Sequence, residues 1–266
     1  MRLFTAFGLA ACVVAAGSGC VSPAARPVEP VALASLVAVR TAGPIQVDGV
    51  LDEPVWQQAP GYVLELAADR ADRGPVQEAG RVRLAWDDAF LYLGVDFADT
   101  DVVAEGFEDQ KPHWQLGDVC ELFLKPADAA YYWELYVTPK GHKTSYWFPG
   151  RGRLGLPSCF AYTCGLTVAA RADGTVNDWR DEDRGWTAEL AMPVADLTAE
   201  GASFGPGSSW RILVSRYNYS QSLKGSGPEL TMTPRLSVTN FHTVDEYGEL
   251  RFEALPGEPT APAVSE

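Results

Sequence analysis

The sequence predicts an all-β fold, an antiparallel β-sandwich of the jelly-roll type that forms a single domain. Two observations lead to this prediction. Short runs rich in β-branched and aromatic residues recur along the chain, and Gly, Pro, Asp or Asn turns separate them. The stretch 39–255 also has the length of one domain that can bury a substantial core.

The strand-like runs follow one another in order. The first, residues 81–86, alternates apolar and basic side chains, and Asp87-Asp88 then fits a tight hairpin into the second run. Only residues 193–197 are predicted to be helical, because proline suits the first turn of a helix. The other predicted strands are 90–97, 119–124, 131–137, 143–148, 160–169, 186–192, 210–219 and 247–253.

The N-terminal residues predict export. Arg2 precedes an uncharged apolar run, which passes into small residues and then Cys20. Residues 1–19 therefore resemble a signal peptide, too short to span a bilayer as a helix. A cysteine at this point is typical of bacterial lipoprotein signals, so we expect Cys20 to be acylated. Gly17 departs from the pattern, since an apolar residue usually stands there, and the alternative is ordinary cleavage to a soluble protein.

Two low-complexity segments flank the predicted domain. Residues 20–38 are rich in Pro and Ala and predict an extended tether, while 256–266 predict a flexible tail. Together with the signal, they place the protein in the bacterial cell envelope, attached to a membrane through a lipid anchor only.

Net charge and cysteine usage argue against nucleic-acid binding and against a zinc site. The net charge of −14 argues against nucleic acid, because a phosphate backbone would repel such a surface. Cys120 lies in an apolar strand and is expected to be a buried thiol, whereas Cys159 and Cys164 are close enough in sequence to bridge, though nothing in the spacing requires it. No zinc-ligand spacing occurs.

The eight tryptophans and ten tyrosines are many for one domain. Aromatic rings stack on the apolar C–H face of a pyranose, but most aromatic residues of a sandwich belong to its core. Trp114 differs, because it lies in a polar, Gly-containing loop before a strand, and Phe241 lies in a similar loop. Both are candidates for ligand binding. The tryptophans expected in the core are Trp86, Trp133, Trp186 and Trp210.

Two glutamates share strand faces with apolar residues. Alternation places Glu121 beside Val119 and Phe123, and it places Glu134 beside Tyr132 and Tyr136. A carboxylate on an apolar face is costly unless it is hydrogen-bonded, so both are expected to be site residues. For Glu134, the alternative is an outer, solvated face.

Four ordered motifs resemble the carbohydrate-binding module family 9 domain, a DOMON-related β-sandwich. They are the segment 47–56 with its Asp-Gly, acidic residue and Trp, the paired strands 82–93, the Asp-x-x-Glu strand 118–124 and the closing segment 241–252. The resemblance spans roughly residues 40–253 and keeps these motifs in order.

This resemblance implies a slot in which two aromatic rings clamp the end of a sugar chain. In the family's pattern, Trp114 takes the position of the first clamping ring and Phe241 that of the second. Glu121 takes the position of the glutamate that accepts sugar hydroxyls. Asp118 and His242 belong to the same motifs and complete the expected carbohydrate-binding set with Glu134. At Glu134 the chain departs from the family, whose sugar-binding members carry a basic residue there.

The resemblance also bears on cofactors. The family's structural calcium cannot be assigned, since no residue set matches a calcium loop, although pairs such as Asp99 and Asp101 or Asp181 and Asp183 have oxygen ligands to offer. No catalytic residue, metal or other cofactor is predicted.

Three functions compete. The first is a non-catalytic lipoprotein that binds a saccharide, with carbohydrate-active enzymes or transporters as further partners. The second is a glycoside hydrolase that uses Glu121 and Glu134 as its carboxyl pair. The third is a haem-binding redox domain of the DOMON type, for which the axial candidates are His113, His142, His242, Met192 and Met232.

The anchor can be tested directly. If Cys20 is acylated, Cys20→Ser should move the protein from the detergent phase to the aqueous phase in a phase-partition assay, because acyl chains bind detergent micelles. A wild-type protein already in the aqueous phase would contradict the lipoprotein prediction.

Overall fold

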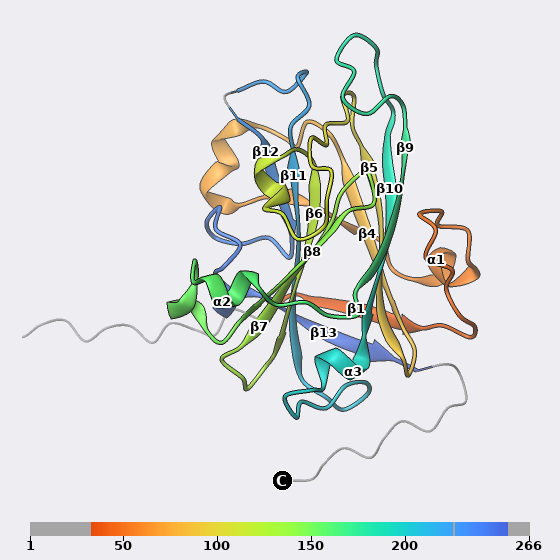
Figure 1. Cartoon of the computed structure of the whole chain (residues 1–266), viewed down its shortest axis with the longest axis vertical. Helices are drawn as coiled ribbons and strands as arrows, with labels where there is room; N and C mark the ends of the chain where they lie inside the picture. Colours follow the sequence, from red (N-terminus) through yellow and green to blue (C-terminus); the bar gives the residue numbers. More distant parts are fainter. Residues whose placement is uncertain (1–32, 226, 255–266) are drawn as a thin grey trace, which may run out of the picture. The chain divides into compact units, whose positions relative to one another are not determined.

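The computed structural model describes residues 33–225 and 227–254, and most of its regular structure is β-strand (Figure 1). The all-β prediction is confirmed. The strands are β1 Ser35–Arg40, β2 Tyr62–Val63, β3 Glu65–Leu66, β4 Gly80–Trp86, β5 Phe90–Ala98, β6 Val119–Pro126, β7 Tyr132–Val137, β8 Lys143–Phe148, β9 Thr167–Asp173, β10 Gly185–Pro193, β11 Trp210–Asn218, β12 Glu229–Thr233 and β13 Gly248–Glu253. The helices are α1 Pro54–Gln58, α2 Pro157–Phe160 and α3 Val194–Leu197, with short 3-10 helices η1 Ala68–Arg73, η2 His113–Gln115, η3 Arg151–Arg153 and η4 Val244–Glu246.

The strands pair into one folded sheet whose two halves face each other (Figure 1). Its order is β8-β7-β6-β11-β13-β1-β4-β5-β10-β9, while β12 extends from β11, and the short β3 and β2 pair with β12 and β4. Neighbouring strands are antiparallel, except that β1 runs parallel to both β13 and β4. The predicted antiparallel sandwich therefore contains one parallel strand, which lies where the two halves join.

The main core fills the space between the two halves. From β6, Cys120, Leu122 and Leu124 point into it, and β4 and β5 supply Leu84 and Leu93 from the opposite half. The four tryptophans expected in the core lie in this cluster and are at most 4 % exposed, which confirms their structural role: Trp86, Trp133, Trp186 and Trp210.

Strands β6 and β7 are buried on their other face as well. Val119 and Phe123 of β6 pack there with Tyr132 and Tyr136 of β7, in a second cluster separate from the main core. A strand with one face in water would alternate buried and exposed residues, but every residue of β7 is buried. This second covered face carries the candidate site.

A buried carboxylate explains the Asp-Gly and Trp motif near the N-terminus. Oε2 of Glu189 on β10 accepts the backbone N–H groups of Asp48 and Gly49 at 2.9 and 3.0 Å, and Oε1 accepts the indole N–H of Trp56 at 2.9 Å. Gly49 has φ +85°, and a Cβ there would lie 2.8 Å from the backbone of Ala170. The motif is therefore structural and attaches α1 to the outer face of the sheet.

Several boundaries differ from the sequence prediction. The expected strand 160–169 is replaced by α2, which ends at Phe160, and by β9, which begins at Thr167. Ser35–Arg40 forms β1, so the domain begins inside the predicted tether 20–38 rather than at residue 39. Strands β1, β2, β3 and β12 were not predicted. The predicted signal 1–19, Cys20 and the tail 256–266 lie outside the described residues.

Cys159 and Cys164 are free thiols in different clusters. The Sγ of Cys159 donates to the carbonyl of Arg153 at 3.3 Å, whereas that of Cys164 lies 3.9 Å from Sδ of Met192. The structure therefore corrects the suggestion of a local bridge, because α2 turns the two side chains toward separate parts of the core. In the part of the chain that the structure describes, no helix is long and apolar enough to cross a membrane.

We predict that Glu189→Ala lowers the free energy of unfolding by about 3 kcal/mol, because three N–H donors lose their acceptor at a buried position. Chemical denaturation measures the loss. Glu189→Gln keeps the side chain's shape and one acceptor oxygen, so it should cost less than Glu189→Ala. Asp173→Ala, at an exposed ion pair, is the control. Equal stability of Glu189→Ala and wild type would contradict the proposed attachment.

Candidate functional site

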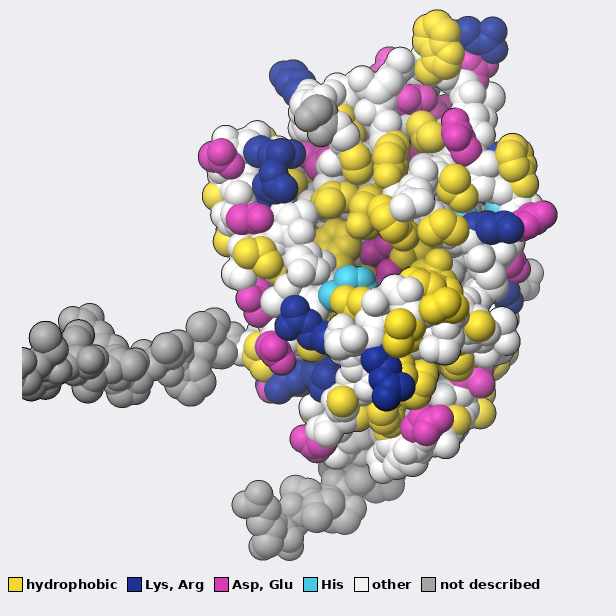
Figure 2. All heavy atoms as spheres, turned by 60° about the vertical axis from the view of Figure 1, so that its left-hand side comes forward, with side chains coloured by type: hydrophobic (Ala, Val, Ile, Leu, Met, Phe, Trp, Pro, Cys, Tyr) yellow, Lys and Arg dark blue, Asp and Glu magenta, His cyan; other side chains and the backbone are white. Residues whose placement is uncertain are grey.

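A cavity of about 320 Å³ opens over the second covered face of β6, β7, β8 and β11 (Figure 2). We call it the aromatic pocket. The space-filling view shows an apolar hollow with acidic side chains inside it and a histidine at its edge. The pocket is lined by Trp114, Glu121, Phe123, Glu134, Tyr146, Phe148, Leu154, Gly155, Phe160, Tyr217, Leu230, Thr239, Asn240, Phe241 and His242.

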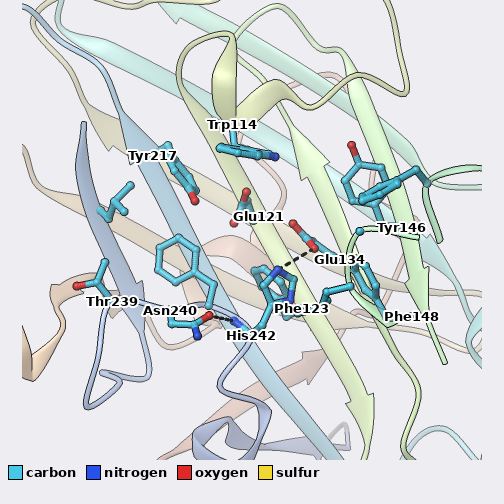
Figure 3. A pocket seen from close by; sticks show the side chains of 15 residues that line it. Trp114, Glu121, Phe123, Glu134, Tyr146, Phe148, Tyr217, Thr239, Asn240 and His242 are labelled. Atoms are coloured by element: carbon cyan, nitrogen blue, oxygen red, sulfur yellow. Dashed lines mark hydrogen bonds and ion pairs between the residues drawn. The ribbon is translucent and has the colours of Figure 1, made fainter. Parts of the chain in front are cut away.

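The sequence-predicted residues meet here, with one exception. Trp114, Glu121, Glu134, Phe241 and His242 all line the pocket although they come from distant segments. Figure 3 shows Trp114 above the two carboxyl groups and His242 on the opposite side.

Asp118 is the exception, because it does not line the pocket. Its carboxylate accepts the backbone N–H groups of Val103 and Tyr219, each at 2.7 Å. Asp118 is 1 % exposed, and burial raises its pKa well above the ordinary value. It therefore closes the loop that carries Trp114 and lies outside the lining of the pocket.

A buried histidine fixes the same loop from its other side. His113, the residue before Trp114, has its Nδ1 at 2.8 Å from the Thr144 hydroxyl and its Nε2 at 3.1 Å from the Glu108 carbonyl. Burial lowers the pKa of this imidazole. With both ring nitrogens engaged by the protein, His113 holds η2 on β8 and presents the neighbouring indole to the pocket.

Trp114 is the open ring of the pocket. It is 36 % exposed, and its ring centroid lies 6.2 Å from that of Tyr217, with 42° between the planes. A large aromatic surface left exposed at a pocket mouth is available for stacking on a ligand. Phe160 of α2 is also exposed at the pocket, and its ring meets that of Tyr146 edge to face at 4.9 Å.

Phe241 contributes less than the predicted second clamping ring. It lines the pocket but is only 6 % exposed, and it packs against Tyr217 at 5.6 Å and Phe123 at 6.3 Å between ring centroids. Most of its surface is therefore committed to the protein. The ring of Tyr217 lies between those of Phe241 and Trp114. Tyr217 is therefore the aromatic neighbour of Trp114 in the pocket.

Two carboxyl groups form the floor. Glu121 is 2 % exposed and Glu134 5 %, and they stand on adjacent strands, Glu134 being paired in register with Phe123. Oε2 of Glu121 accepts the Ser215 hydroxyl at 3.0 Å, and Oε1 of Glu134 accepts the Tyr136 hydroxyl. The prediction that both lie on apolar-flanked faces is confirmed, and the alternative of a solvated face for Glu134 is wrong, because that face is the pocket floor.

Burial favours the protonated form of both carboxyl groups. It raises the pKa of Glu134 to about 7, and burial together with the neighbouring Glu134 raises the pKa of Glu121 well above its ordinary value. Burial also lowers the pKa of His242 to about 4. Nε2 of His242 lies 3.7 Å from Oε2 of Glu134, but between these two pKa values both groups are neutral, so this contact is not an ion pair.

Sequence reasoning missed much of the wall. Tyr217 and Tyr146 are strand residues whose alternation marks them as one-faced, but nothing local says which face opens to a cavity. Phe160 was assigned to a strand, whereas it ends α2. Asn240 could have been found from the sequence, because it directly precedes the predicted Phe241. In the structure its Oδ1 accepts the backbone N–H of His242 at 3.0 Å.

Three of the four residues considered for calcium, Asp99, Asp101 and Asp183, accept backbone N–H groups. Asp99 Oδ1 accepts the N–H of Asp101, Asp101 Oδ2 accepts that of Gln221, and Asp183 binds the amides of Val102 and Thr175. Among the described residues, no three His, Cys, Asp or Glu side chains are grouped to hold a metal ion.

The haem alternative gains no support from the geometry. Met192 and Met232 are fully buried in two different clusters, and Nδ1 of His242 lies 3.0 Å from the Tyr132 hydroxyl. The rings of His113 and His142 stack on each other.

Comparison with known proteins identifies the fold. No family model and no curated protein matches the sequence. A Bacteroides uniformis protein, provisionally described as carbohydrate-binding, superposes with a TM-score of 0.60 at 14 % identity, over 83 % of this chain and 99 % of its own.

Two solved structures of a family 9 carbohydrate-binding module from Caldicellulosiruptor kristjanssonii also share the fold. The complex with cellotriose has a TM-score of 0.56 at 13 % identity and covers 87 % of this chain and 100 % of its own. The glucose complex has a TM-score of 0.56 at 13 % identity, over 85 % and 100 %. The chain therefore has the fold of this family, as the ordered motifs predicted.

The raised pKa of Glu134 predicts a pH-dependent effect of Glu134→Gln. The native state favours the protonated carboxyl, so wild type loses stability as pH rises from the ordinary glutamate pKa through about 7. Glu134→Gln removes this loss and should gain up to roughly 3 kcal/mol over wild type between about pH 5 and pH 8. Thermal unfolding at both pH values measures it, with exposed Glu65→Gln as control. Parallel profiles of wild type and Glu134→Gln would contradict the assignment.

Proposed function

We propose that this chain, which has the fold of family 9 carbohydrate-binding modules, binds the end of a saccharide chain in the aromatic pocket without cleaving it. The observation that carries the proposal is the pair of buried carboxyl groups on the floor of a pocket with aromatic walls (Figure 3). A sugar ring has an apolar C–H face and hydroxyls at its edge, so it matches both surfaces.

Each side chain has a role in this proposal. Trp114 stacks on the ring, with Tyr217 beside it as the second aromatic surface. Glu121 and Glu134 exchange hydrogen bonds with hydroxyls, and a carboxyl near its pKa can both accept and donate, as a hydroxyl does. His242 and Asn240 stand at the opposite side of the pocket, where they meet the remaining hydroxyls. Solved structures with the same fold contain glucose and cellotriose.

The protonation of the pair favours binding over hydrolysis. A glycoside hydrolase needs one carboxylic acid and one ionised carboxylate, whose environments push their pKa values apart. Here burial raises the pKa of Glu121 and of Glu134 alike, so the pair lacks the carboxylate with an ordinary or lowered pKa that a hydrolase uses as its nucleophile or base. The protein would then present a saccharide to enzymes or transporters in the cell envelope, with Cys20 as its lipid anchor.

A calorimetric screen tests the proposal, using glucose, cellotriose and a wider panel of mono- and oligosaccharides. Trp114→Ala should weaken the best ligand by about 2 kcal/mol, roughly thirtyfold, because the stacking surface is lost. Its melting temperature should change little, since the ring is exposed. Trp179→Ala, at a 67 % exposed tryptophan outside the pocket, is the matched control and should bind as wild type.

Three results would overturn the proposal. The first is a panel without any bound saccharide. The second is a large fall in melting temperature for Trp114→Ala with unchanged affinity, which would make the ring part of the core. The third is sustained release of reducing sugar by wild type, abolished by Glu121→Gln, which would make the protein a hydrolase.

A further inference from the structure

A second cavity, of about 530 Å³, adjoins the aromatic pocket. Leu230 and Thr239 line both cavities, so the two cavities lie side by side at β12 and share these two residues. Figure 3 shows Thr239 at the border of the aromatic pocket, on the side away from Tyr146 and Phe148. The chemistry changes at this border, because the second cavity has no aromatic lining residue among those described.

Basic side chains surround the second cavity. Arg70 and Arg73 come from η1, and Lys224 comes from the segment between β11 and β12. Their gathering is unusual in a chain with 21 basic and 35 acidic residues. Figure 2 shows basic side chains near the apolar hollow. Within the described residues, neither Arg73 nor Lys224 forms an ion pair, so their charges are available to a ligand.

Two carboxylates stand among these basic groups and accept hydrogen bonds from the protein. Glu229 lines the second cavity itself, and Oδ1 of Asp69 lies 3.9 Å from Nε of Arg70, so Arg73 and Lys224 carry the charge that this ion pair does not offset. Glu229 is 8 % exposed, and its oxygens accept the backbone N–H of Gln77 at 3.0 and 3.2 Å and that of Glu78 at 3.4 Å. Oδ1 of Asp69 accepts the amide and hydroxyl of Thr239 at 3.1 and 2.8 Å.

The framework of the cavity is tied together by hydrogen bonds. Nε of Arg70 donates to Oγ1 of Thr239 at 3.1 Å, and the backbone N–H of Lys224 donates to Oε1 of Gln77 at 2.7 Å. The side chain of Arg70 and the backbone at Lys224 are therefore held in place beside the border with the aromatic pocket.

We propose that the second cavity is a subsite for an anionic group on the saccharide, so that the protein prefers an acidic oligosaccharide to a neutral one. This inference rests on the proposed function and adds the class of ligand. Guanidinium and ammonium groups bind a uronate carboxylate and a sulfate ester alike. The carboxyl pair of the aromatic pocket does not line the second cavity, and at about 0.1 M salt more distant acidic residues are screened beyond roughly 10 Å.

Matched ligand pairs test the subsite by calorimetry. Neutral cellotriose is compared with cellotriose that carries one C6 carboxylate and with cellotriose that carries one 6-sulfate. Xylotriose and glucuronate-substituted xylotriose form a second pair, and galactotriose and trigalacturonate a third. In at least one pair the acidic member should bind roughly two- to fivefold tighter, in the range of exposed ion pairs. Whether carboxylate or sulfate gives the gain identifies the anionic group.

A charge variant separates this subsite from general effects. The double variant Arg73→Gln with Lys224→Gln should abolish the preference and leave the affinity for the neutral member within about twofold. Arg171→Gln, at an exposed arginine of β9 outside both cavities, is the matched control and should keep the preference.

The outcomes distinguish the two proposals. Neutral saccharides that bind as well as their acidic partners, with no effect of the double variant, would overturn the subsite and leave saccharide binding intact. A preference for acidic saccharides that survives the double variant would also overturn it. If neither neutral nor acidic members bind to wild type, the proposed function itself fails.

Discussion

The site depends on the burial of both faces of strands β6 and β7. One face packs in the main core, and the other would be a second core if it carried only apolar residues. Glu121 and Glu134 interrupt that second face, where an ionised carboxylate without partners is costly. Hydrogen bonds from Ser215 and Tyr136, and a preference for the protonated form, make the pair tolerable. The result is a polar floor under apolar walls, which suits a ligand with both kinds of surface.

Acidic residues elsewhere in the chain show what distinguishes this pair. The oxygens of Asp118 and Glu189 are filled by backbone or indole N–H donors, and each attaches a loop to the sheet. Both are as buried as the pocket glutamates, so burial alone does not mark a site. Glu121 and Glu134 differ because hydroxyls rather than the backbone satisfy them and because a cavity opens over them. Hydroxyl partners can rotate when a ligand arrives, whereas backbone partners are fixed by the fold.

Contacts of the neighbouring residues, and not of the indole itself, fix the position of Trp114. The indole is held through its neighbours, His113 against Thr144 and Asp118 against Val103 and Tyr219. The ring can therefore remain exposed while its backbone is restrained on two sides. Restraint before binding reduces the entropy that a ligand must overcome when it orders its site. At Leu230 and Thr239 the lining changes from aromatic to basic, so the two neighbouring cavities differ in chemistry.

Local sequence determined most of the long strands, the faces of β6 and β7 and the loop position of Trp114, because alternation and turn residues depend on neighbours one or two places apart. It therefore placed Glu121 and Glu134 among apolar neighbours correctly. Only the tertiary structure decided that their face is a pocket, that Tyr217 stands beside Trp114 while Phe241 is buried, and that Asp118 serves the backbone. It also decided that β1 inserts between β13 and β4, and that η1 meets Lys224 at a second cavity. These features depend on pairing between segments far apart in the chain, and no local pattern records which distant segment will cover a given face.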